Sequence, residues 1–112
     1  MWDRQTFMTT ILNKKKHVLF CFYQFQGPNN EKTLKEQIQS NIPSYLDLYF
    51  IDITYEYSLY ETLTQKKVMS QCPCILFYSK NNGSFYPSGI HNYIHDDILT
   101  FRKFLKKCNK MS

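Results

Sequence analysis

The sequence contains no alanine, and its only two arginines are Arg4 and Arg102. Without alanine, the core has to be built from larger side chains such as phenylalanine, tyrosine, leucine and isoleucine. The scarcity of arginine argues against base-specific recognition of DNA, in which arginine is the commonest contact. The same bias, together with many asparagines and lysines, indicates an AT-rich coding sequence of the kind that a virus or a parasite would carry.

Long apolar runs are also missing. No stretch approaches the length of a membrane span, and the amino end lacks the basic-then-apolar order of a secretory signal. We therefore expect an intracellular protein, cytoplasmic or nuclear, that does not contact a membrane. In that compartment the four cysteines, Cys21, Cys72, Cys74 and Cys108, are expected to be reduced thiols rather than a disulfide scaffold.

The length of 112 residues predicts a single domain over 1–112, and a composition that is 43% hydrophobic and 17% aromatic predicts a compact globule. The formal net charge is +5 and comes mostly from lysine, with clusters at 14–16 and 103–110. Such clusters can neutralise phosphates. They can also complement a helix dipole and keep a domain soluble, and the scarcity of base-reading arginines favours this second interpretation.

Apolar periodicity and turn residues divide the chain into eight elements. Four helices and four strands are expected at 3–13 (helix), 17–23 (strand), 29–42 (helix), 46–54 (strand), 58–68 (helix), 74–78 (strand), 84–87 (strand) and 96–108 (helix). The order α-β-α-β-α-β-β-α predicts a parallel strand pair with a right-handed crossover, followed by an antiparallel hairpin. The fold class is therefore α/β, with a central mixed four-stranded sheet flanked by about four helices.

Capping and turn residues set the expected boundaries. Asp3 is placed to cap the first helix, and Asn29 or Asn30 the second, which Pro43 is expected to end. The Asn82-Gly83 pair is expected to supply the positive φ angles of a tight hairpin turn. Asp96 and Asp97 open the last helix, whose buried stripe is expected to contain Ile98, Phe101 and Leu105.

The loop after the first strand resembles the active-site turn of thioredoxins. That family carries Trp-Cys-Gly-Pro-Cys where this chain has Phe25, Gln26, Gly27, Pro28 and Asn29. The Gly-Pro pair is kept and both cysteines are replaced. The resemblance covers nearly the whole chain and implies a thioredoxin-like fold.

Three further positions extend this resemblance. Pro73 matches the family's cis-proline, which lies against the active-site loop, and Gly89 matches the glycine that follows the hairpin. The family's buried proton-transferring aspartate falls on Phe20. The loss of both thiols and of the acid implies a domain without dithiol redox activity, because disulfide exchange needs an attacking thiolate and a resolving thiol.

The function that this pattern favours is a protein-binding or assembly module, not an enzyme with a dithiol site. The binding surface is expected to comprise the residues of the loop and those around the two later positions, namely Phe25, Gln26, Gly27, Pro28, Asn29, Cys72, Pro73 and Gly89. The abundant tyrosines and phenylalanines are consistent with an exposed aromatic patch and with self-association.

A single-thiol oxidoreductase or redox sensor is the first alternative. Cys72 precedes Pro73, so the resemblance places its thiol on the substrate-facing surface, and an imidazolium at His91 would lower its pKa. The favoured interpretation is a small, inert residue at a tight turn, because cysteine often behaves as a small hydrophobic residue. A disulfide between Cys72 and Cys74 would be strained, because Pro73 stands between them.

Metal binding and nucleic-acid binding are the remaining alternatives. Cys72, Cys74, His91 and His95 carry zinc-compatible atoms, but their spacing is not that of a zinc knuckle, so neither a metal nor another cofactor is expected. The basic surface, the sequence Asp-Ile-Thr at 52–54 and the Pro73-Cys74 pair faintly resemble the thioredoxin-like component of the spliceosome. That resemblance implies a ribonucleoprotein role.

Overall fold

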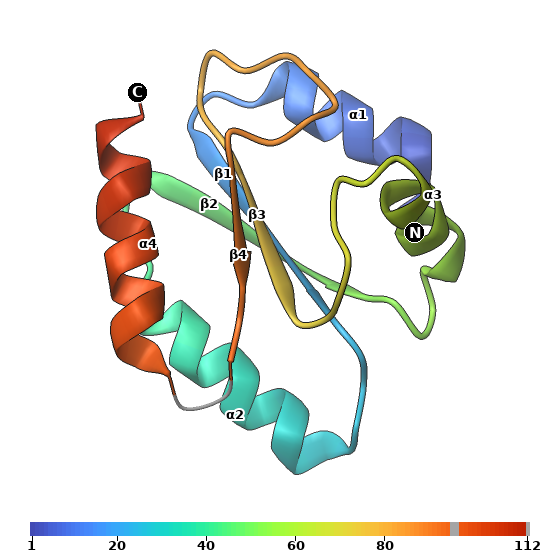
Figure 1. The fold of residues 1–112 in the computed structure, drawn as a ribbon, viewed down its shortest axis with the longest axis vertical. Helices are drawn as coiled ribbons and strands as arrows, with labels where there is room; N and C mark the ends of the chain where they lie inside the picture. The colour runs from blue at the N-terminus through green and yellow to red at the C-terminus, as the bar shows by residue number, and fades with distance from the viewer. Residues whose placement is uncertain (95–96, 112) are drawn as a thin grey trace.

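The computed structural model describes residues 1–94 and 97–111 (Figure 1). These residues form four helices and four strands in the predicted order: α1 (Arg4–Asn13), β1 (His17–Tyr23), α2 (Pro28–Gln39), β2 (Leu46–Asp52), α3 (Tyr57–Gln65), β3 (Cys74–Tyr78), β4 (Gly89–Asn92) and α4 (Ile98–Lys110). The predicted α/β class and element order are therefore confirmed.

The four strands form one mixed sheet in the order β2-β1-β3-β4. β1 pairs in parallel with β2, from His17 opposite Leu46 to Tyr23 opposite Asp52, and antiparallel with β3. β1 is central because its run of apolar side chains can be buried on both faces of the sheet. The predicted parallel pair and antiparallel hairpin are both present.

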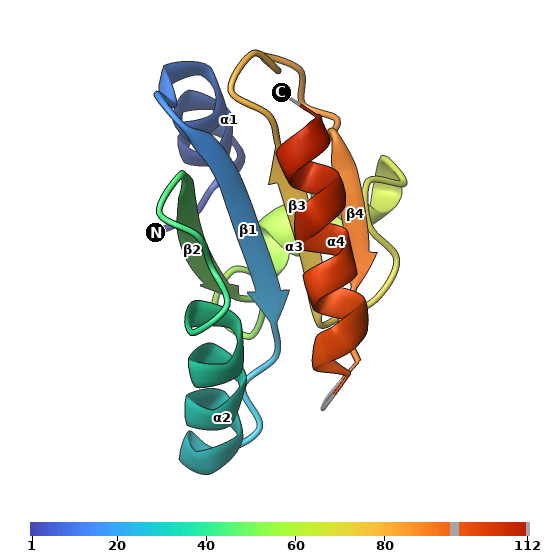
Figure 2. The same cartoon turned by 90° about the vertical axis from the view of Figure 1, so that its left-hand side faces the viewer.

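Helices cover the two faces of the sheet, and Figure 2 shows α4 in front of the sheet and α3 behind it. Alternate residues of β1 point to opposite faces. Val18, Phe20 and Phe22 pack in the core formed with α1 and α3. Leu19, Cys21 and Tyr23 pack in the core formed with α2 and α4. α2 follows β1 after a short loop, so the carboxyl end of β1 and the amino end of α2 lie at the same end of the sheet.

The predicted N-terminal caps of α1 and α4 are present, whereas that of α2 is not. Asp3 accepts a hydrogen bond from the Thr6 N–H at 2.7 Å, and Asp97 accepts one from the Thr100 N–H at 3.1 Å. Asp96 lies outside the described residues. The prediction for the second helix was wrong, because α2 already begins at Pro28, whose missing N–H costs nothing at the first helical position.

Both ends of α2 differ from the prediction. Gly27, with φ of 102°, takes the N-cap position, and Asn29 and Asn30 lie inside the helix instead of capping it. α2 also ends at Gln39, before Pro43, where the backbone N–H of Ser40 donates to the Glu36 carbonyl. Pro43 is thus not the residue that ends the helix.

The connection between β3 and β4 also differs from the prediction. Residues 79–88 form a loop, and β4 is Gly89–Asn92 rather than the sequence Ser-Phe-Tyr-Pro at 84–87. Gly83 does not adopt positive φ, so no tight turn forms at Asn82-Gly83. Phe85 instead packs edge-on against Phe7 of the core, and its carbonyl accepts a hydrogen bond from the Tyr78 hydroxyl. The loop therefore uses its aromatic residue to close the core.

Candidate functional site

A pocket of about 370 Å³ lies where the end of β1, the start of α2 and the segment before β3 meet. Its lining residues come from three parts of the chain: Tyr23, Gln24, Gln26, Asn30, Glu31, Leu34, Cys72, Pro73 and Tyr93. Three of the predicted site residues, Gln26, Cys72 and Pro73, are thus brought together. Phe25, Gly27, Pro28 and Asn29 belong to the adjoining loop and helix start but do not line the pocket.

Hydrogen bonds hold the loop in place. The Asp52 carboxylate accepts from the Phe25 N–H at 3.3 Å and from the Thr54 N–H at 2.9 Å. The Asn30 side-chain amide donates to the Gln26 carbonyl at 2.9 Å. The Phe25 side chain remains 40% exposed. The loop thus presents an aromatic ring to solvent on a backbone that is fixed from two sides.

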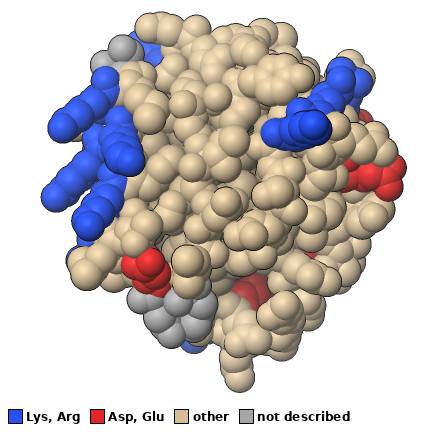
Figure 3. All heavy atoms as spheres, viewed as in Figure 1, with Lys and Arg blue, Asp and Glu red and all other residues tan. Residues whose placement is uncertain are grey.

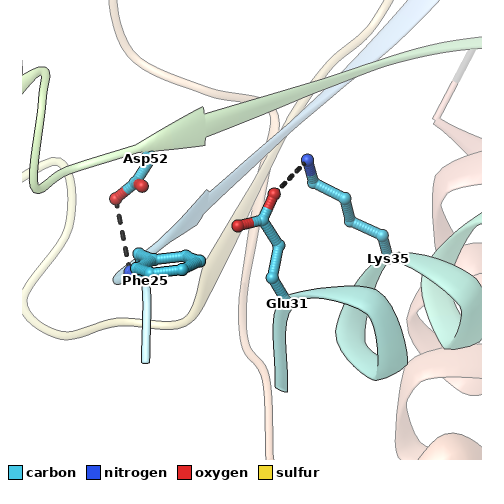
Figure 4. A network of polar contacts seen from close by, with 4 residues as sticks. All are labelled: Phe25, Glu31, Lys35 and Asp52. Carbon is cyan, nitrogen blue, oxygen red and sulfur yellow. Dashed lines mark hydrogen bonds and ion pairs between the residues drawn. The ribbon is translucent and has the colours of Figure 1, made fainter. Parts of the chain in front are cut away.

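Glu31, which lines the pocket, belongs to a charged pair. The Lys35 ammonium donates to the Glu31 carboxylate at 2.7 Å, one helical turn away (Figure 4). The same ammonium lies 5.5 Å from the ring centroids of Tyr23 and Phe50. The hydrogen bond to Glu31 raises the pKa of Lys35, and burial raises the pKa of Tyr23. The pocket therefore carries a carboxylate whose position is fixed by its partner.

Cys72 and Pro73 also line the pocket. The peptide bond between them is cis, and the Pro73 carbonyl accepts a hydrogen bond from the Tyr93 N–H at 3.0 Å. Cys72 is half-buried, and this burial raises the pKa of its thiol to about 11. The lowered pKa that the single-thiol alternative requires is therefore not found, and the raised value fits the inert residue that the sequence favoured. At neutral pH the thiol is protonated, which is the unreactive form.

His91 does not supply the charge that was expected to activate Cys72. Its ring is buried beneath α4, where it stacks on Phe104 with centroids 5.1 Å apart. Burial lowers the pKa of His91, so the imidazole is neutral at neutral pH. Its Nε2 atom makes no hydrogen bond within the described part of the chain. His91 therefore packs as a neutral ring.

Gly89 and Phe20 serve packing. A Cβ at Gly89 would approach Cε1 of Phe104 to 3.3 Å, so the glycine allows α4 to lie close to β4. Phe20 is fully buried, with its ring centroid 4.6 Å from that of Phe7 and 5.6 Å from that of Tyr49. The resemblance assigns a proton-transferring acid to this position. In this structure Phe20 is instead part of the hydrophobic core.

The proposed zinc ligands do not form a site within 1–94 and 97–111. No three His, Cys, Asp or Glu side chains of these ranges lie close enough together to hold a metal ion, and His95 falls outside them. Cys21, Cys74 and Cys108 are buried free thiols, and burial raises the pKa of each. None of the described helices is both long and apolar enough to cross a membrane.

Sequence reasoning missed several lining residues, namely Tyr23, Gln24, Asn30, Glu31, Leu34 and Tyr93. Asn30, Glu31 and Leu34 share one face of α2 at spacings of three and four, a pattern that helix periodicity could have revealed. Tyr93 reaches the pocket only because β4 pairs with β3, and its hydroxyl donates to Oε1 of Gln37 at 2.6 Å. No local sequence pattern predicts the contact between Tyr93 and Gln37.

Among the comparisons with known proteins, only the one with solved structures bears on the fold. No protein-family model matches the chain, and no curated protein sequence matches it. Among solved structures, chloroplastic thioredoxin z is 10% identical with a TM-score of 0.62, over 97% of this chain and 92% of that one. The thioredoxin of Malassezia sympodialis (Mala s 13) is 13% identical with a TM-score of 0.62, over 96% and 86%. The Trx4 domain of ERdj5 is 16% identical with a TM-score of 0.62, over 99% and 95%.

Each of these similarities covers most of this chain and most of the chain that it is compared with. At such low identities they show the fold alone. The chain has the thioredoxin fold, as its resemblance to that family implied.

Proposed function

We propose that this protein is a thioredoxin-fold binding module that holds a polypeptide partner at the pocket without dithiol-disulfide exchange. The observation that carries the proposal is the make-up of the pocket. Its walls combine apolar surface from Tyr23, Leu34 and Pro73 with hydrogen-bonding groups from Gln26 and Glu31, and with one protonated thiol. Such a mixture binds and orients a ligand but offers no nucleophile at neutral pH.

A polypeptide suits this surface because its backbone offers both donors and acceptors. The amides of Gln24 and Gln26 can each donate and accept hydrogen bonds, so they can pair with either backbone group. Phe25, exposed beside the pocket, provides the kind of aromatic anchor that dominates binding energy in protein interfaces. The fixed loop lowers the entropy that binding would otherwise cost.

The single-thiol alternative rests on Cys72 alone. Mixed-disulfide formation requires a thiolate, and the pKa of about 11 leaves very little thiolate at neutral pH. The described cysteines are all unpaired, which is consistent with the reducing intracellular compartment expected from the sequence. We therefore place binding ahead of thiol chemistry.

Filling the pocket tests the proposal. Gln26→Trp places an indole in the pocket, and we expect it to abolish retention of the partner on immobilised protein. The matched control is Leu12→Trp, which adds the same ring to an exposed position of α1 at the other end of the molecule (Figure 1). Retained proteins are compared by mass spectrometry, first without and then with a reductant.

The control variant is expected to retain the same partner as the unmodified protein. Equal retention by all three proteins would show that the pocket is not the binding surface. Loss of retention on adding reductant would favour the Cys72 alternative instead. Thermal unfolding of both variants, followed by circular dichroism, distinguishes a filled pocket from a misfolded chain.

A second candidate function, binding to nucleic acid, is favoured by one surface. Lys103, Lys106, Lys107 and Lys110 follow a helical spacing of i, i+3, i+4 and i+7 and are all exposed on α4. Basic side chains gather over this helix in Figure 3. None of these four lysines forms an ion pair with a described residue. They are therefore available to contact phosphates.

The other lysine cluster contributes less to such a surface. Lys14 donates to the carbonyls of Ile11 and Asn82, which ties α1 to the loop at 79–88. Lys16 lies near Asp47 at 4.0 Å. The test of the second function is therefore confined to α4.

Salt titration of RNA binding provides that test. Each lysine that neutralises a phosphate contributes about 0.7 to the slope of log affinity against log salt for a single strand. Replacing Lys106 and Lys107 with Gln is expected to lower the slope by roughly 1.4 if both make contacts, whereas Lys15→Gln leaves it unchanged. An equal slope for all three proteins would exclude α4 as the contact surface.

A further inference from the structure

The outer edge of β2 has no partner within the described residues. β2 is the first strand of the sheet order and pairs with β1 alone. Its seven residues match β1 one to one, without a bulge, and include no lysine, proline or glycine. The other edge strand, β4, has four residues and begins with Gly89.

Proteins usually protect such edges, because a row of unpaired N–H and C=O groups recruits further strands. The usual devices are shortness, a bulge, proline, or charged side chains, above all lysine. β4 is short, whereas β2 has seven residues and carries charge only at Asp47 and at its last residue, Asp52. The side chains at its centre, Leu48, Tyr49 and Phe50, are apolar or aromatic and only half-buried. This edge is therefore suited to pair with another strand.

We propose that β2 pairs antiparallel with β2 of a second copy of this chain, which joins two four-stranded sheets into one. The strand is self-complementary about Tyr49. A twofold axis perpendicular to the sheet at Tyr49 pairs every residue of Leu46–Asp52 with another residue of that strand. This is the closed, isologous arrangement that most homodimers adopt.

The register follows from two conditions. Residues that pair directly across an antiparallel interface point to the same face, so an axis of this kind has to pass through a residue pair and not between two residues. An axis at Leu48 would pair only 46–50 within the strand, and one at Phe50 only 48–52. The axis at Tyr49 alone uses the full strand.

The side chains agree with this register. Leu48 lies opposite the partner's Phe50 on the α2 side of the sheet, and Tyr49 lies opposite the partner's Tyr49 on the α1 side. Such aromatic and apolar cross-strand pairs stabilise sheets. Each acidic residue faces an apolar one: Asp47 lies opposite the partner's Ile51, and Asp52 opposite the partner's Leu46. No like charges oppose each other.

The surface beside the edge has room for these contacts. A hollow of about 380 Å³ borders β2 on the α1 side, and its lining includes Asp47 and Tyr49 together with Thr9, Thr10 and Asn13. The partner's Tyr49 would enter this space. The hollow therefore lies on the same side of the sheet as the proposed pair of Tyr49 residues.

Native mass and site-specific disulfides test the proposal on the full chain. Analytical ultracentrifugation over a concentration series is expected to show a species of twice 13.5 kDa. In Tyr49→Cys, mild oxidation is expected to link residue 49 of one copy to residue 49 of the other, identified by peptide mass spectrometry. The control is Leu99→Cys, which is exposed on α4 and reports random collisions.

A second pair of variants keeps the test valid if the loss of Tyr49 weakens the dimer. Leu48→Cys is expected to form no link to itself, but when mixed with Phe50→Cys it is expected to give the 48–50 disulfide. A monomer at every concentration would overturn the proposal. A dimer in which neither the 49–49 nor the 48–50 link exceeds the Leu99→Cys background would overturn it as well.

Discussion

Phe20 occupies the position at which the thioredoxin resemblance expects a buried aspartate, and aromatic rings surround it. Trp2, Phe7 and Tyr49 all lie within 6 Å of its ring, centroid to centroid. Phe20 is therefore part of the core, and its phenyl ring can neither accept nor release a proton.

Introducing an acid at this position is expected to destabilise the fold severely. Phe20→Asp removes a large apolar side chain and buries a carboxyl without a partner, so we expect a loss of about 4 kcal/mol or more in the free energy of unfolding. Phe20→Leu, which keeps the site apolar, is expected to lose about 1–2 kcal/mol. Urea titration measures both, and equal losses would contradict the view that this site excludes charge.

Cys72 is expected to react slowly despite its place on the pocket wall. Because burial raises its pKa to about 11, its alkylation rate is expected to increase about tenfold per pH unit between about pH 7 and 9, without a plateau. Cys74 and Cys108, which are buried, are expected to label only after unfolding. Peptide mass spectrometry of native protein measures each rate.

The raised pKa of Cys72 also predicts how the stability of the fold changes at alkaline pH. A thiol whose folded-state pKa exceeds its ordinary value of 9.0 stabilises the fold below that value, because the unfolded chain releases the proton first as the pH increases. Stability is therefore expected to fall between about pH 9 and 11. A plateau in the labelling of Cys72 near neutral pH would instead reveal a reactive thiolate and favour the single-thiol alternative.

At the scale of elements, the sequence predicts what local patterns determine. The apolar run His17–Tyr23 marks β1 correctly, and the spacing of Phe101 and Leu105 marks the buried face of α4. The start of α2 was misjudged because two asparagines offered a familiar cap, whereas Pro28 fits the first helical position. The loop at 79–88 was misjudged because the Asn82-Gly83 pair favours a turn locally, while the tertiary contact of Phe85 with Phe7 favours a longer loop.

Gly27 provides a test of how α2 begins. Its φ of 102° and ψ of 154° fall in a region that other residues rarely adopt, although nothing would touch an added Cβ. Gly27→Ala is therefore expected to cost about 1–3 kcal/mol by backbone strain alone. Thermal unfolding measures the change.

Gly83→Ala is the matched control for that variant. Its φ is not positive, and an added Cβ would lie 3.7 Å from Leu12, an ordinary contact. This variant is expected to be neutral or to stabilise the protein by about 0.4–1 kcal/mol. A smaller loss for Gly27→Ala than for Gly83→Ala would show that the loop does not hold Gly27 in this conformation.

At the scale of the whole molecule, the pocket is assembled from segments that are distant in the sequence. The resemblance to thioredoxins predicted that the loop at 25–29 and Pro73 lie together, and the structure places Gln26 beside Cys72 and Pro73. The contribution of Tyr93 could not be predicted, because it depends on strand pairing. The electrostatic environment of Cys72 could not be predicted either, since burial depends on neighbours that only the fold supplies.

The same fold separates the surfaces for which we propose different roles. The pocket lies at the end of the sheet where β1 leads into α2, the lysines lie along α4, and the unpaired edge belongs to β2. A partner at the pocket, a phosphate backbone on α4 and a second copy on β2 would therefore each respond to a different set of substitutions.

The central claim is that the pocket binds a polypeptide without thiol chemistry, and photo-crosslinking from Phe25 tests it most directly. Benzoylphenylalanine replaces Phe25, which is 40% exposed, or Leu12, which is 62% exposed and remote from the pocket. Both are irradiated in native extract under reducing conditions. We expect a polypeptide crosslinked from position 25 and not from position 12, with a yield unchanged by Cys72→Ser. No product from position 25, or a product that requires Cys72, would contradict the account.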